Sequence, residues 1–544
     1  MNNFISRTIC FLILFSIVSC TPDLELIPET EQTIAEVLLE IPDGFDFKTS
    51  ETVSITIHDT EADALYKVYA QYRTIDLQLP DSLQLNYDEV KKNDIVYNFK
   101  FSGTTQNGSL SQQIAVPTYA KKVFIRRKGA EGFTDYVASI NNQSVVLNHN
   151  KSSSKHTSSK QQRSAYTIVS SPLSGDVFVN GNALIAAGLN TNGFDLEVTG
   201  NLTISGATNL ANTSSITASN IIMSGNVNLN GGLIFSDQIT VSGNLNGSGF
   251  IYYCVSYTVT GNINHNQATS VIQQQCGSDS DGDGVADVDD AYPDDPTKAY
   301  QIFSPSPSDY AVLFFEDLWP SYGDYDFNDV ALRYRRLIIT NAQNKAVQVD
   351  FICDVKNSAA GYTNGIGVEY TGISPSSIQS VTGTLYTEGY ITTNSNGTEA
   401  GQSSAVVVFT DNADNLLTQT TVSIVLASPT NTSSINDAKF NPFIISNKNR
   451  AREIHLPNKP STTLGSNAID NGGMNSDPYG NFISTQGFSW GLSILEDVPT
   501  PKEGVRISDA YNLFDSWATS GGINDEDWYK DLPGHRNTAL LDND

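Results

Sequence analysis

The chain has 544 residues, of which 59 are acidic and 31 basic, so its formal net charge is −28. At about 150 residues per domain, this length predicts three or four domains. The negative charge repels nucleic-acid phosphates and anionic membrane surfaces, so nucleic-acid binding is set aside as a function. Only 17% of the residues are charged, and the abundant Ser, Thr, Asn, Gly, Tyr and Phe are typical of β-sheet surfaces. We therefore expect an all-β, multidomain protein.

The N-terminus predicts a bacterial lipoprotein signal. Arg7 provides a positive charge, and Ile9–Val18 is an apolar run of ten residues, too short to span a bilayer. The run ends in Ile-Val-Ser-Cys, which resembles a lipobox, where the signal peptidase cleaves before Cys20 and lipid is attached to its sulfur. An ordinary signal peptide with an incidental cysteine is the alternative. We expect a signal peptide at 1–19, a tether at 20–40, and membrane attachment through the lipid.

Alternating polar and apolar residues predict strands across 41–148, as in the phrase ETVSITIHD (Glu51–Asp59). Turn residues separate such runs every roughly 8–15 residues, which is the pattern of a small β-sandwich. A basic patch at Lys121–Lys128 is interpreted as a solvated strand face. Residues 149–167 are rich in Ser and Lys and poor in apolar residues, so they predict a flexible linker.

A repeat of about 20 residues marks the segment 168–272. Its Gly-Asn pairs recur at intervals of 19, 25, 18 and 18 residues, beginning at Gly181, Gly200, Gly225, Gly243 and Gly261. The repeat predicts a right-handed parallel β-helix with Leu, Ile and Val inside, Asn, Thr and Ser ladders outside, and Gly-Asn turns of positive φ. A second β-sandwich is the alternative. Since the segment has no Lys or Arg, a scaffold is favoured over the active site of a polysaccharide lyase.

Three cysteines are expected to remain once Cys10 leaves with the signal and Cys20 carries the lipid. In an oxidising compartment, Cys254 and Cys276 are close enough in sequence to form a disulfide. Cys353 lies in the apolar phrase VDFICDV, so we expect it to be a buried thiol in a strand.

The acidic phrase DSDGDGVADVDD lies in the segment 276–298, between the repeats and the C-terminal part. Its spacing matches an EF-hand-type calcium loop, with Gly284 at the sharp turn in position six. The expected ligands, at positions 1, 3, 5, 7, 9 and 12, are Asp279, Asp281, Asp283, Val285 (through its carbonyl), Asp287 and Asp290. Oxygen ligands alone argue against zinc or copper. Position 12 is Asp rather than Glu, which shortens its reach. A solvated acidic linker is the alternative to this calcium-binding connector.

A second acidic phrase, FFEDLWPSYGDYDFNDV, spans Phe314–Val330. In an extended chain, one face would carry Asp324, Asp326 and Asn328, and the opposite face would carry Tyr325, Phe327 and Asp329. Glu316 and Asp317 could add oxygens if the chain turns between Pro320 and Gly323. We therefore predict a second calcium site, and its expected ligands are Glu316, Asp324, Asp326, Asn328 and Asp329. A polar turn capped by aspartates is the alternative.

The remaining part, 300–544, contains many strand-like runs and predicts a larger β-sandwich or jelly roll. The phrase Gly487-Phe-Ser-Trp-Gly491 fits G-x-S-x-G, but a nucleophile elbow needs a helix after the serine. Here the apolar alternation continues as a strand, which places Ser489 on a polar strand face. His455 and His535 are interpreted as structural residues, so no catalytic residue is assigned.

Two resemblances follow from these phrases. The phrase DSDGDGVADVDDAYPDDP resembles the thrombospondin type 3 repeat, which implies a calcium-rigidified connector between domains. The lipobox, IPDGFDFKTS, FEDLWPSYGDYDFNDVALRYR, REIHLPNKPST and WYKDLPGHRN together resemble the LruC-domain lipoproteins of Bacteroidetes-type bacteria. The resemblance covers mainly 300–544, with a weaker one at 41–130, and it implies an envelope lipoprotein with a calcium-binding domain. The segment 168–272 matches no part of that family.

These features predict a calcium-binding lipoprotein of the cell envelope that acts as a surface binding, adhesion or structural module. We expect Ca²⁺ as its cofactor and a glycan or another envelope protein as its partner. The expected location is the outer membrane, exposed at the surface, with the periplasmic face as the alternative. Two further hypotheses remain, namely a carbohydrate-active enzyme and a purely structural matrix component. Paired carboxylates in an aromatic groove would favour the enzyme.

Overall fold

The computed structural model describes most of the chain after residue 39, in ranges given at the end of this paragraph. The expected signal peptide, Cys20, nearly all of the tether and linker, and Cys276 lie outside these ranges. In the described part, no helix has both the length and the apolarity needed to cross a membrane. The described residues are 40–70, 72–74, 94–96, 98–129, 132–149, 166–179, 182–212, 214–264, 269–273, 279–357, 361–465, 477 and 479–542.

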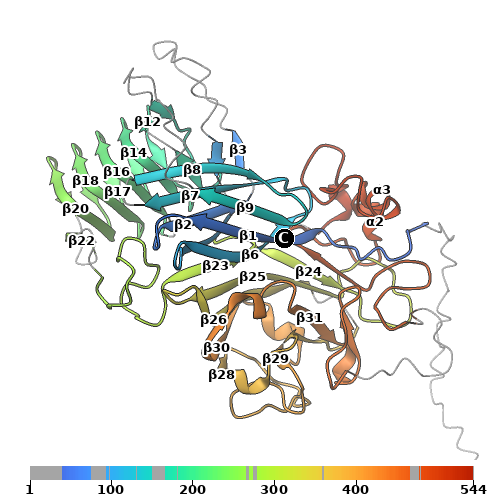
Figure 1. Cartoon of the computed structure of the whole chain (residues 1–544). Coiled ribbons are helices and arrows are strands. Elements are labelled where there is room, and N and C mark those ends of the chain that lie inside the picture. The colour runs from blue at the N-terminus through green and yellow to red at the C-terminus, as the bar shows by residue number, and fades with distance from the viewer. Residues whose placement is uncertain are drawn as a thin grey trace, which may run out of the picture. The chain divides into compact units, whose positions relative to one another are not determined.

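Strands dominate the fold, and the helices of the described residues are short (Figure 1). The prediction of an all-β, multidomain protein with a β-solenoid is therefore confirmed. The helical turns are α2 (Ile507–Ala510), α3 (Phe514–Thr519), η2 (Pro375–Ser377), η3 (Ala413–Leu416), η4 (Thr432–Ser434), η5 (Ser446–Lys448) and η6 (Thr538–Leu540).

The N-terminal segment forms two facing sheets. In one, β1 (Ser50–Asp59) lies between β6 (Ser109–Pro117), which is antiparallel to it, and β9 (Ser144–His149), which is parallel. The alternation predicted for β1 places Val53, Ile55 and Ile57 in the core. The facing sheet is formed by β2 (Leu65–Ala70), β5 (Phe99–Thr104), β7 (Lys122–Gly129) and β8 (Gly132–Ser139). A separate pair is formed by β3 (Tyr72–Thr74) and β4 (Asp94–Val96).

The basic patch on β7 is not the solvated face that was expected. Arg126 and Arg127 are 1% and 3% exposed. Burial of a guanidinium requires partners that supply negative charge. Arg127 Nη2 lies 2.6 Å from Glu61 Oε2, and Arg126 Nη1 lies 3.1 Å from Glu197 Oε1 in the solenoid. Arg126 and Arg127 therefore join separate segments of the chain instead of facing solvent.

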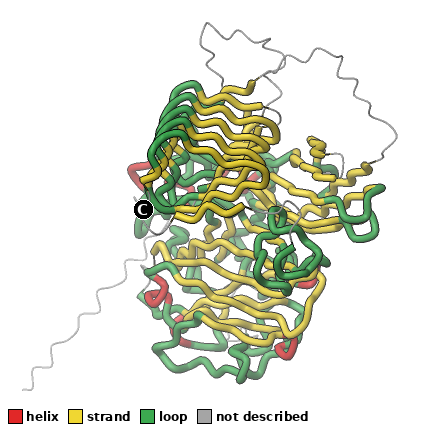
Figure 2. The backbone as a smooth tube through the Cα atoms, turned by 90° about the vertical axis from the view of Figure 1, so that its left-hand side faces the viewer, coloured by secondary structure: helices red, strands yellow, loops and turns green. Residues whose placement is uncertain are grey.

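The solenoid is a stack of parallel coils, visible as parallel rungs in Figure 2. Equivalent core positions pair in register from coil to coil, as Leu196, Ile216, Ile234 and Ile251 show, and all four are fully buried. Its larger sheet contains β10 (Tyr166–Ile168), β11 (Val177–Val179), β12 (Asn182–Ile185), β14 (Leu196–Ile204), β16 (Ser215–Met223), β18 (Leu233–Val241), β20 (Gly249–Val259) and β22 (Thr269–Gln273). The smaller contains β13 (Leu189–Asn190), β15 (Thr208–Asn209), β17 (Val227–Asn228), β19 (Leu245–Asn246) and β21 (Ile263–Asn264).

An asparagine ladder runs along the smaller sheet, as the repeat predicted. The side-chain amides of Asn228, Asn246 and Asn264 each donate to the carbonyl oxygen of the preceding asparagine, at 2.6, 2.9 and 3.2 Å. The prediction that the repeated glycines adopt a positive φ is wrong, however. Gly225, Gly243 and Gly261 do not adopt a positive φ. A Cβ atom on each would come within 2.4 Å of the backbone of the preceding coil, so glycine is needed for close stacking.

The C-terminal segment forms a sandwich whose sheets meet in a shared core. Phe351 and Phe409, one from each sheet, have ring centroids 5.0 Å apart. The larger sheet contains β23 (Tyr300–Ser304), β24 (Ala311–Phe315), β25 (Val330–Thr340), β26 (Lys345–Asn357), β28 (Ile378–Thr382), β30 (Thr420–Asn431) and β33 (Gly491–Ile494). The smaller contains β27 (Gly365–Tyr370), β29 (Ala405–Thr410), β31 (Phe440–Ile445) and β32 (Glu453–His455).

The larger sheet continues into the N-terminal segment, because Ile302 of β23 pairs with Phe101 of β5. The first described residues also contact the C-terminal part of the chain. The rings of Phe45 and Phe47 pack against Trp517 of α3, with centroids 5.1 and 6.0 Å apart. Segments from both ends of the sequence thus share one core.

The cysteines agree with expectation where the structure describes them. Cys353 is a free thiol, fully buried in β26, and burial raises its pKa to about 12. Cys254 in β20 is disulfide-bonded. Cys276, its predicted partner, lies outside the described residues.

Candidate metal sites

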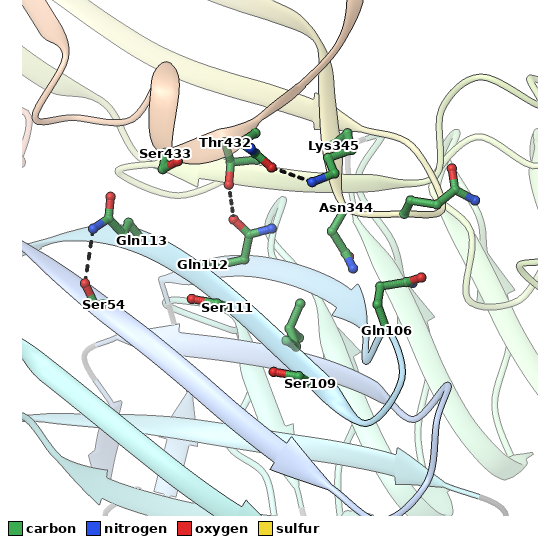
Figure 3. Close-up of a pocket in the computed structure, with 13 residues that line it drawn as sticks. Ser54, Gln106, Ser109, Ser111, Gln112, Gln113, Asn344, Lys345, Thr432 and Ser433 are labelled. Carbon is green, nitrogen blue, oxygen red and sulfur yellow. Dashed lines mark hydrogen bonds between the residues drawn. The ribbon is translucent and has the colours of Figure 1, made fainter.

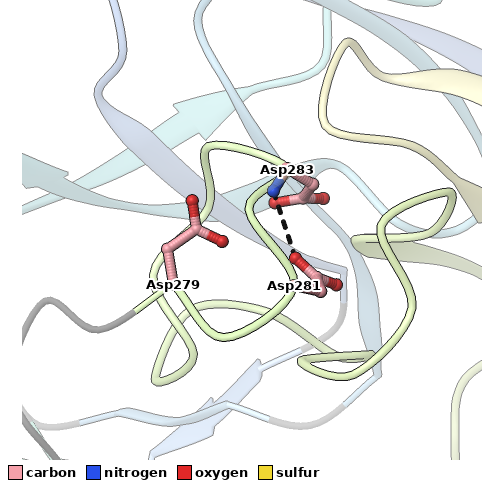
Figure 4. A group of neighbouring side chains, drawn as sticks. All are labelled: Asp279, Asp281 and Asp283. Carbon is pink, nitrogen blue, oxygen red and sulfur yellow. Dashed lines mark hydrogen bonds between the residues drawn. The ribbon is translucent and has the colours of Figure 1, made fainter.

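The connector loop brings its first three aspartates together. One oxygen each from Asp279, Asp281 and Asp283 lies within 4.8 Å of the others (Figure 4). The loop amides fold the chain around these carboxylates. Asp279 accepts hydrogen bonds from the amides of Gly282 and Gly284, at 2.8 and 2.9 Å. Both glycines have a positive φ, 79° and 96°, which glycine adopts without a steric cost.

Several carboxylate oxygens of this loop have no protein partner. The amide of Asp283 donates to Asp281 Oδ1, that of Val285 to Asp283 Oδ1 and that of Tyr292 to Asp290 Oδ1. The second oxygens of Asp281, Asp283 and Asp290 are buried and unpartnered. Burial and the charges of Asp283, Asp281 and Asp287 raise the pKa of Asp290 to about 7. Positions 3, 5 and 12 therefore each keep one buried carboxylate oxygen without a hydrogen-bond partner among the described residues.

The other two expected positions have different surroundings. Asp287 accepts hydrogen bonds from the amide and the hydroxyl of Ser280, both at 2.7 Å, so its two oxygens already have partners. The side chain of Val285 is 5% exposed. It packs in a small cluster formed by Leu65, Ala299, Tyr300 and Ala342. Val285 therefore fixes the loop between the N-terminal and C-terminal sheets.

The second acidic cluster is assembled at the end of β24. The chain turns after Glu316, and one oxygen each from Glu316, Asp324 and Asp326 lies within 4.8 Å of the others. The backbone of Gly323 lies against Glu316, because a Cβ on this glycine would be 1.9 Å from Glu316 Oε2. Glycine at this position thus allows the loop to close over the carboxylate.

The expected extended conformation of this loop is wrong. Tyr325 and Phe327 have left-handed backbones, with φ of 60° and 57°. Their rings are buried in the core around Trp517. Left-handed φ at two aromatic residues is strained, and here it accompanies the burial of both rings.

The base of the second cluster is fully buried and contains unpartnered oxygens. Glu316 and Asn328 are 0% exposed, and Asp326 is 1% exposed. Glu316 Oε1 accepts the amide of Phe327 at 2.6 Å, and Asp326 Oδ2 accepts the side-chain amide of Asn328 at 2.8 Å. Glu316 Oε2 and Asn328 Oδ1 are buried without a hydrogen-bond partner. Buried polar atoms normally have partners, so these two oxygens are available to accept contacts from a ligand.

The acids of this cluster raise one another's pKa values. Burial, then the charges of Asp329 and Asp326, raise the pKa of Glu316 well above its usual range. Burial raises the pKa of Asp326 to about 6 despite two backbone hydrogen bonds. Burial and the neighbouring Asp317 also raise the pKa of Asp329. Carboxylates in this state lack a compensating positive charge.

Asp329 and Asp317 lie beside this base rather than away from it. The amide of Asp317 donates to Asp329 Oδ2 at 2.8 Å. Asp317 Oδ2 accepts the side chain of Asn364 at 2.7 Å, and Arg452 is a positive charge that acts on Asp317. The expectation that Asp329 faces away from Asp324 and Asp326 is therefore wrong, since both charges act on it.

Glu503 is an acid near this cluster that the sequence did not indicate. The pKa of Glu503 is raised by burial and by the charges of Asp324 and Asp317. Its loop is attached to the cluster by Gly504, whose amide donates to Asp326 Oδ2 at 2.8 Å, and by Pro501, whose carbonyl accepts Asn328 Nδ2 at 3.2 Å. Only the tertiary fold brings this loop to residues 324–328.

A third acidic group belongs to the solenoid. Three of its four acids line a pocket of about 330 Å³ together with Lys67 and Tyr69, namely Asp176, Asp195 and Glu197. Burial opposes the ionisation of Glu197, but Lys67 and Arg126 hold its pKa below the usual value. The basic residues that the solenoid lacks are thus supplied by β2 and β7, and Glu197 is a compensated charge.

A second pocket, also about 330 Å³, lies between β6 and the loops before β26 and after β30 (Figure 3). Its side chains are mainly amides and hydroxyls that bond to one another. Thr432 Oγ1 donates to Gln112 Oε1 at 2.5 Å, and Gln113 Nε2 donates to Ser54 Oγ at 3.1 Å. The first bond joins the N-terminal and C-terminal segments, and the second joins β6 to β1 within the N-terminal sheet.

The residues considered for catalysis have structural surroundings. Ser489 is 1% exposed, not on an exposed polar face, and the chain continues into β33 as expected. His455 is fully buried, with its ring nitrogens 2.8 Å from Asn441 Oδ1 and 3.0 Å from Glu453 Oε2. His535 Nε2 lies 3.5 Å from Asp527 Oδ1.

The C-terminal part of the chain is similar to a known family. Residues 344–529 match the domain of unknown function DUF4842, which includes Glu503 but begins after Asp329. No curated protein matches the chain. A solved structure described as "Putative lipoprotein from Bacteroides ovatus" is 17% identical, with a TM-score of 0.35, and the match covers 45% of this chain and 76% of that chain. The family similarity thus concerns about a third of the chain, on the C-terminal side of the second acidic cluster.

Proposed function

We propose that this protein is a calcium-binding lipoprotein of the bacterial cell envelope, with one ion in the connector loop and another in the second acidic cluster. In this proposal it acts as a surface binding or structural module rather than as an enzyme. The solenoid and the two sandwiches supply the scaffold, and the ions stabilise the loops between and beside them.

One observation carries the calcium proposal. In the second cluster, Glu316 Oε2 and Asn328 Oδ1 are buried and unpartnered, and they lie among carboxylates that lack a counter-charge. Burying an uncompensated charge costs several kcal/mol even after relaxation. A bound cation removes this cost, because it supplies the positive charge and the missing partners together.

The ligand chemistry favours calcium among common cations. Among the described residues, the two carboxylate clusters contain Asp and Glu and neither His nor Cys, whereas zinc and copper prefer nitrogen or sulfur ligands. Calcium accepts six to eight oxygens in flexible geometry. The 1-3-5 spacing of Asp279, Asp281 and Asp283, with Gly284 at position six, is also that of calcium loops.

The connector gives the ion a mechanical role in this proposal. Val285 packs against Leu65 and Tyr300, and Lys128 Nζ of β7 lies 2.7 Å from Asp289 Oδ1. A loop held at these points becomes rigid when an ion neutralises its aspartates. Calcium would thus fix the link between the solenoid and the C-terminal sandwich.

The envelope location is supported by the sequence and by one covalent bond. The lipobox-like Ile-Val-Ser-Cys predicts a lipid on Cys20. Disulfides form and persist mainly in oxidising compartments, and Cys254 is disulfide-bonded. The outer membrane, with surface exposure, is the location proposed, and a glycan or another envelope protein is the partner proposed.

Calorimetric titration of the mature chain, produced from residue 21 without its anchor, tests this function. We expect about two calcium ions per chain and a higher melting temperature in calcium than in chelator. D281N/D283N and E316Q/D326N should each remove one ion, whereas D63N, at an exposed aspartate outside both clusters, should remove none. Absence of binding at millimolar calcium would overturn the proposal.

A further inference from the structure

We propose that the ion in the second acidic cluster keeps coordination positions open to solvent, and that these positions bind the vicinal hydroxyl groups of a neutral glycan. This inference rests on the proposed calcium binding and names the ligand of the same site.

The cluster has a buried base and an exposed rim. Glu316, Asp326 and Asn328 form the base and are at most 1% exposed. Asp324 and Glu503 are exposed, although both belong to the same group of interacting charges. An ion seated on the base is therefore covered by protein on one side and reached by solvent from the side of the rim.

The protein does not offer enough oxygens to complete the coordination of calcium. Glu316, Asp324 and Asp326 bring one oxygen each within 4.8 Å of the others, and Asn328 and Asp329 lie beside them. Both oxygens of Asp326 accept amide hydrogen bonds, and Asp329 Oδ2 accepts one, so each of these two residues is expected to provide at most one oxygen. Calcium takes six to eight oxygens, which leaves about one to three positions for water or a ligand. Two adjacent positions suit the neighbouring hydroxyls of a sugar ring.

The charge balance selects a neutral ligand. Six carboxyl groups interact here, including Asp317 and Glu503, and Arg452 is a basic residue acting on one of them, Asp317. A divalent ion leaves the site negative, so a phosphate, sulfate or uronic acid would be repelled. Hydroxyl groups carry no charge, and they can both coordinate calcium and donate hydrogen bonds to Asp324 and Glu503.

Tyr322 provides an apolar surface next to the rim. Its side chain is 40% exposed, and its hydroxyl is held by Thr485 Oγ1 at 2.8 Å. It directly precedes Gly323, whose backbone lies against Glu316. A ring fixed in this way can pack against the C–H groups of a sugar whose hydroxyls bind the ion.

Terbium luminescence tests the open positions directly. In D281N/D283N, whose connector loop is disabled, lifetimes in H₂O and D₂O count the water molecules on an ion bound in the second cluster. We expect about two waters, and a fall in this number when a neutral polysaccharide such as mannan or galactan is added. A count of zero, or no change with either polysaccharide, would overturn the inference.

Affinity electrophoresis through the same polysaccharides tests the ligand on the mature chain. Retardation is expected in calcium, is lost in chelator, and is absent with anionic polygalacturonate. Y322A should weaken retardation about tenfold while its calcium affinity stays unchanged. Phe250, equally exposed on the solenoid at 40%, supplies the matched control F250A, which should retain full binding.

The two proposals fail in different ways. Calcium binding with no retardation by mannan or galactan overturns the glycan inference and leaves the proposed function intact. Absence of calcium binding overturns both. Retardation that persists in chelator would show that the glycan does not bind through the calcium ion, and would overturn the inference.

Discussion

In the connector loop, the acidic side chains come from twelve consecutive residues, whereas in the second cluster they come from the loop between β24 and β25 and from the distant loop of Glu503. The connector carboxylates are mostly held by amides of their own loop. Those of the second cluster accept amides from distant segments, such as Gly504 on Asp326. A cation in the first would organise a loop, and a cation in the second would hold parts of the fold together.

Burial makes the energetic difference between the two clusters. Asp279 is exposed, so water screens its repulsion from the neighbouring aspartates. Glu316 and Asp326 are almost completely buried, and their charge can be relieved only by protonation or by a cation. We therefore expect the larger response to calcium and to pH from the second cluster, and the following changes test this difference.

The largest effect is expected from pH in calcium-free protein. In the second cluster, the pKa values of Asp326 and Asp329 are raised to about 6 and about 8, above the value of 3.8 that they have when unfolded. The folded state therefore holds protons that the unfolded state has lost, so stability falls as pH rises from about 4 to 8, by about 1.4 kcal/mol per pKa unit for a buried group. Urea unfolding at pH 5 and pH 8 measures this.

Saturating calcium should weaken or reverse this pH dependence, because the ion holds the carboxylates in their charged form. Calcium-free protein that is as stable at pH 8 as at pH 5 would contradict the assignment of raised pKa values to these acids.

The effect of Glu316→Gln on the free energy of unfolding should have opposite signs in calcium and in chelator. In calcium, loss of this ligand should lower the free energy of unfolding by about 3 kcal/mol. In chelator, the neutral amide should raise it by about 1–3 kcal/mol, because the folded state no longer has to bury or protonate this carboxylate. The hydrogen bond from the amide of Phe327 can persist in both states. Destabilisation of equal size in both conditions would show that Glu316 has only a packing role.

Asp283→Asn should have a smaller and more local effect. The substitution changes one of the unpartnered oxygens of the connector and can keep the hydrogen bond from the amide of Val285. We expect one ion fewer by calorimetry, and a change in melting temperature smaller than that of E316Q. Proteolysis within 279–292 in calcium should become faster than in wild type. Loss of both ions would mean that the two sites are coupled.

Glu197→Gln should show no calcium-dependent difference. Glu197 has its own cations, Arg126 and Lys67, and the substitution removes the negative charge that lies against the buried guanidinium of Arg126. The melting temperature should fall by the same amount in calcium and in chelator. A fall confined to calcium would show that an acidic group with resident cations also binds the ion, which would remove the distinction between compensated and uncompensated clusters.

The connector could be recognised from sequence because its geometry is local. The distances among Asp279, Asp281 and Asp283 follow from their spacing and from two glycine turns. In the second cluster, the sequence predicts that Glu316 joins Asp324 only if the chain turns between Pro320 and Gly323, and the structure contains this turn. The left-handed backbones of Tyr325 and Phe327 were not foreseen, because they result from the burial of their rings in a core completed by residues 507–529. Glu503 lies far from the other acids of the second cluster in sequence, so no spacing rule could include it.

The same limit applies to the fold. The solenoid, its apolar core and its asparagine ladder were readable, since each coil repeats the previous one. The sequence does not show why Gly225 and Gly243 must be glycine. The reason is the short distance between stacked coils, which only the folded stack defines. In the sequence, Arg126 and Arg127 resemble a solvated strand face. In the structure, Glu197 and Glu61 lie opposite them as ion-pair partners. Contacts between segments explain each of these differences.

The contact of Phe45 and Phe47 with Trp517 determines where a pulling force would enter the molecule. A chain anchored through Cys20 would transmit tension along the tether to residue 41 and then to these rings. The rings pack in the same core as Tyr325 and Phe327, which flank Asp326 in the second cluster. The first part of the fold to bear load would therefore be the C-terminal segment around α3, and the strands of the N-terminal sandwich would be loaded only after these aromatic contacts had separated.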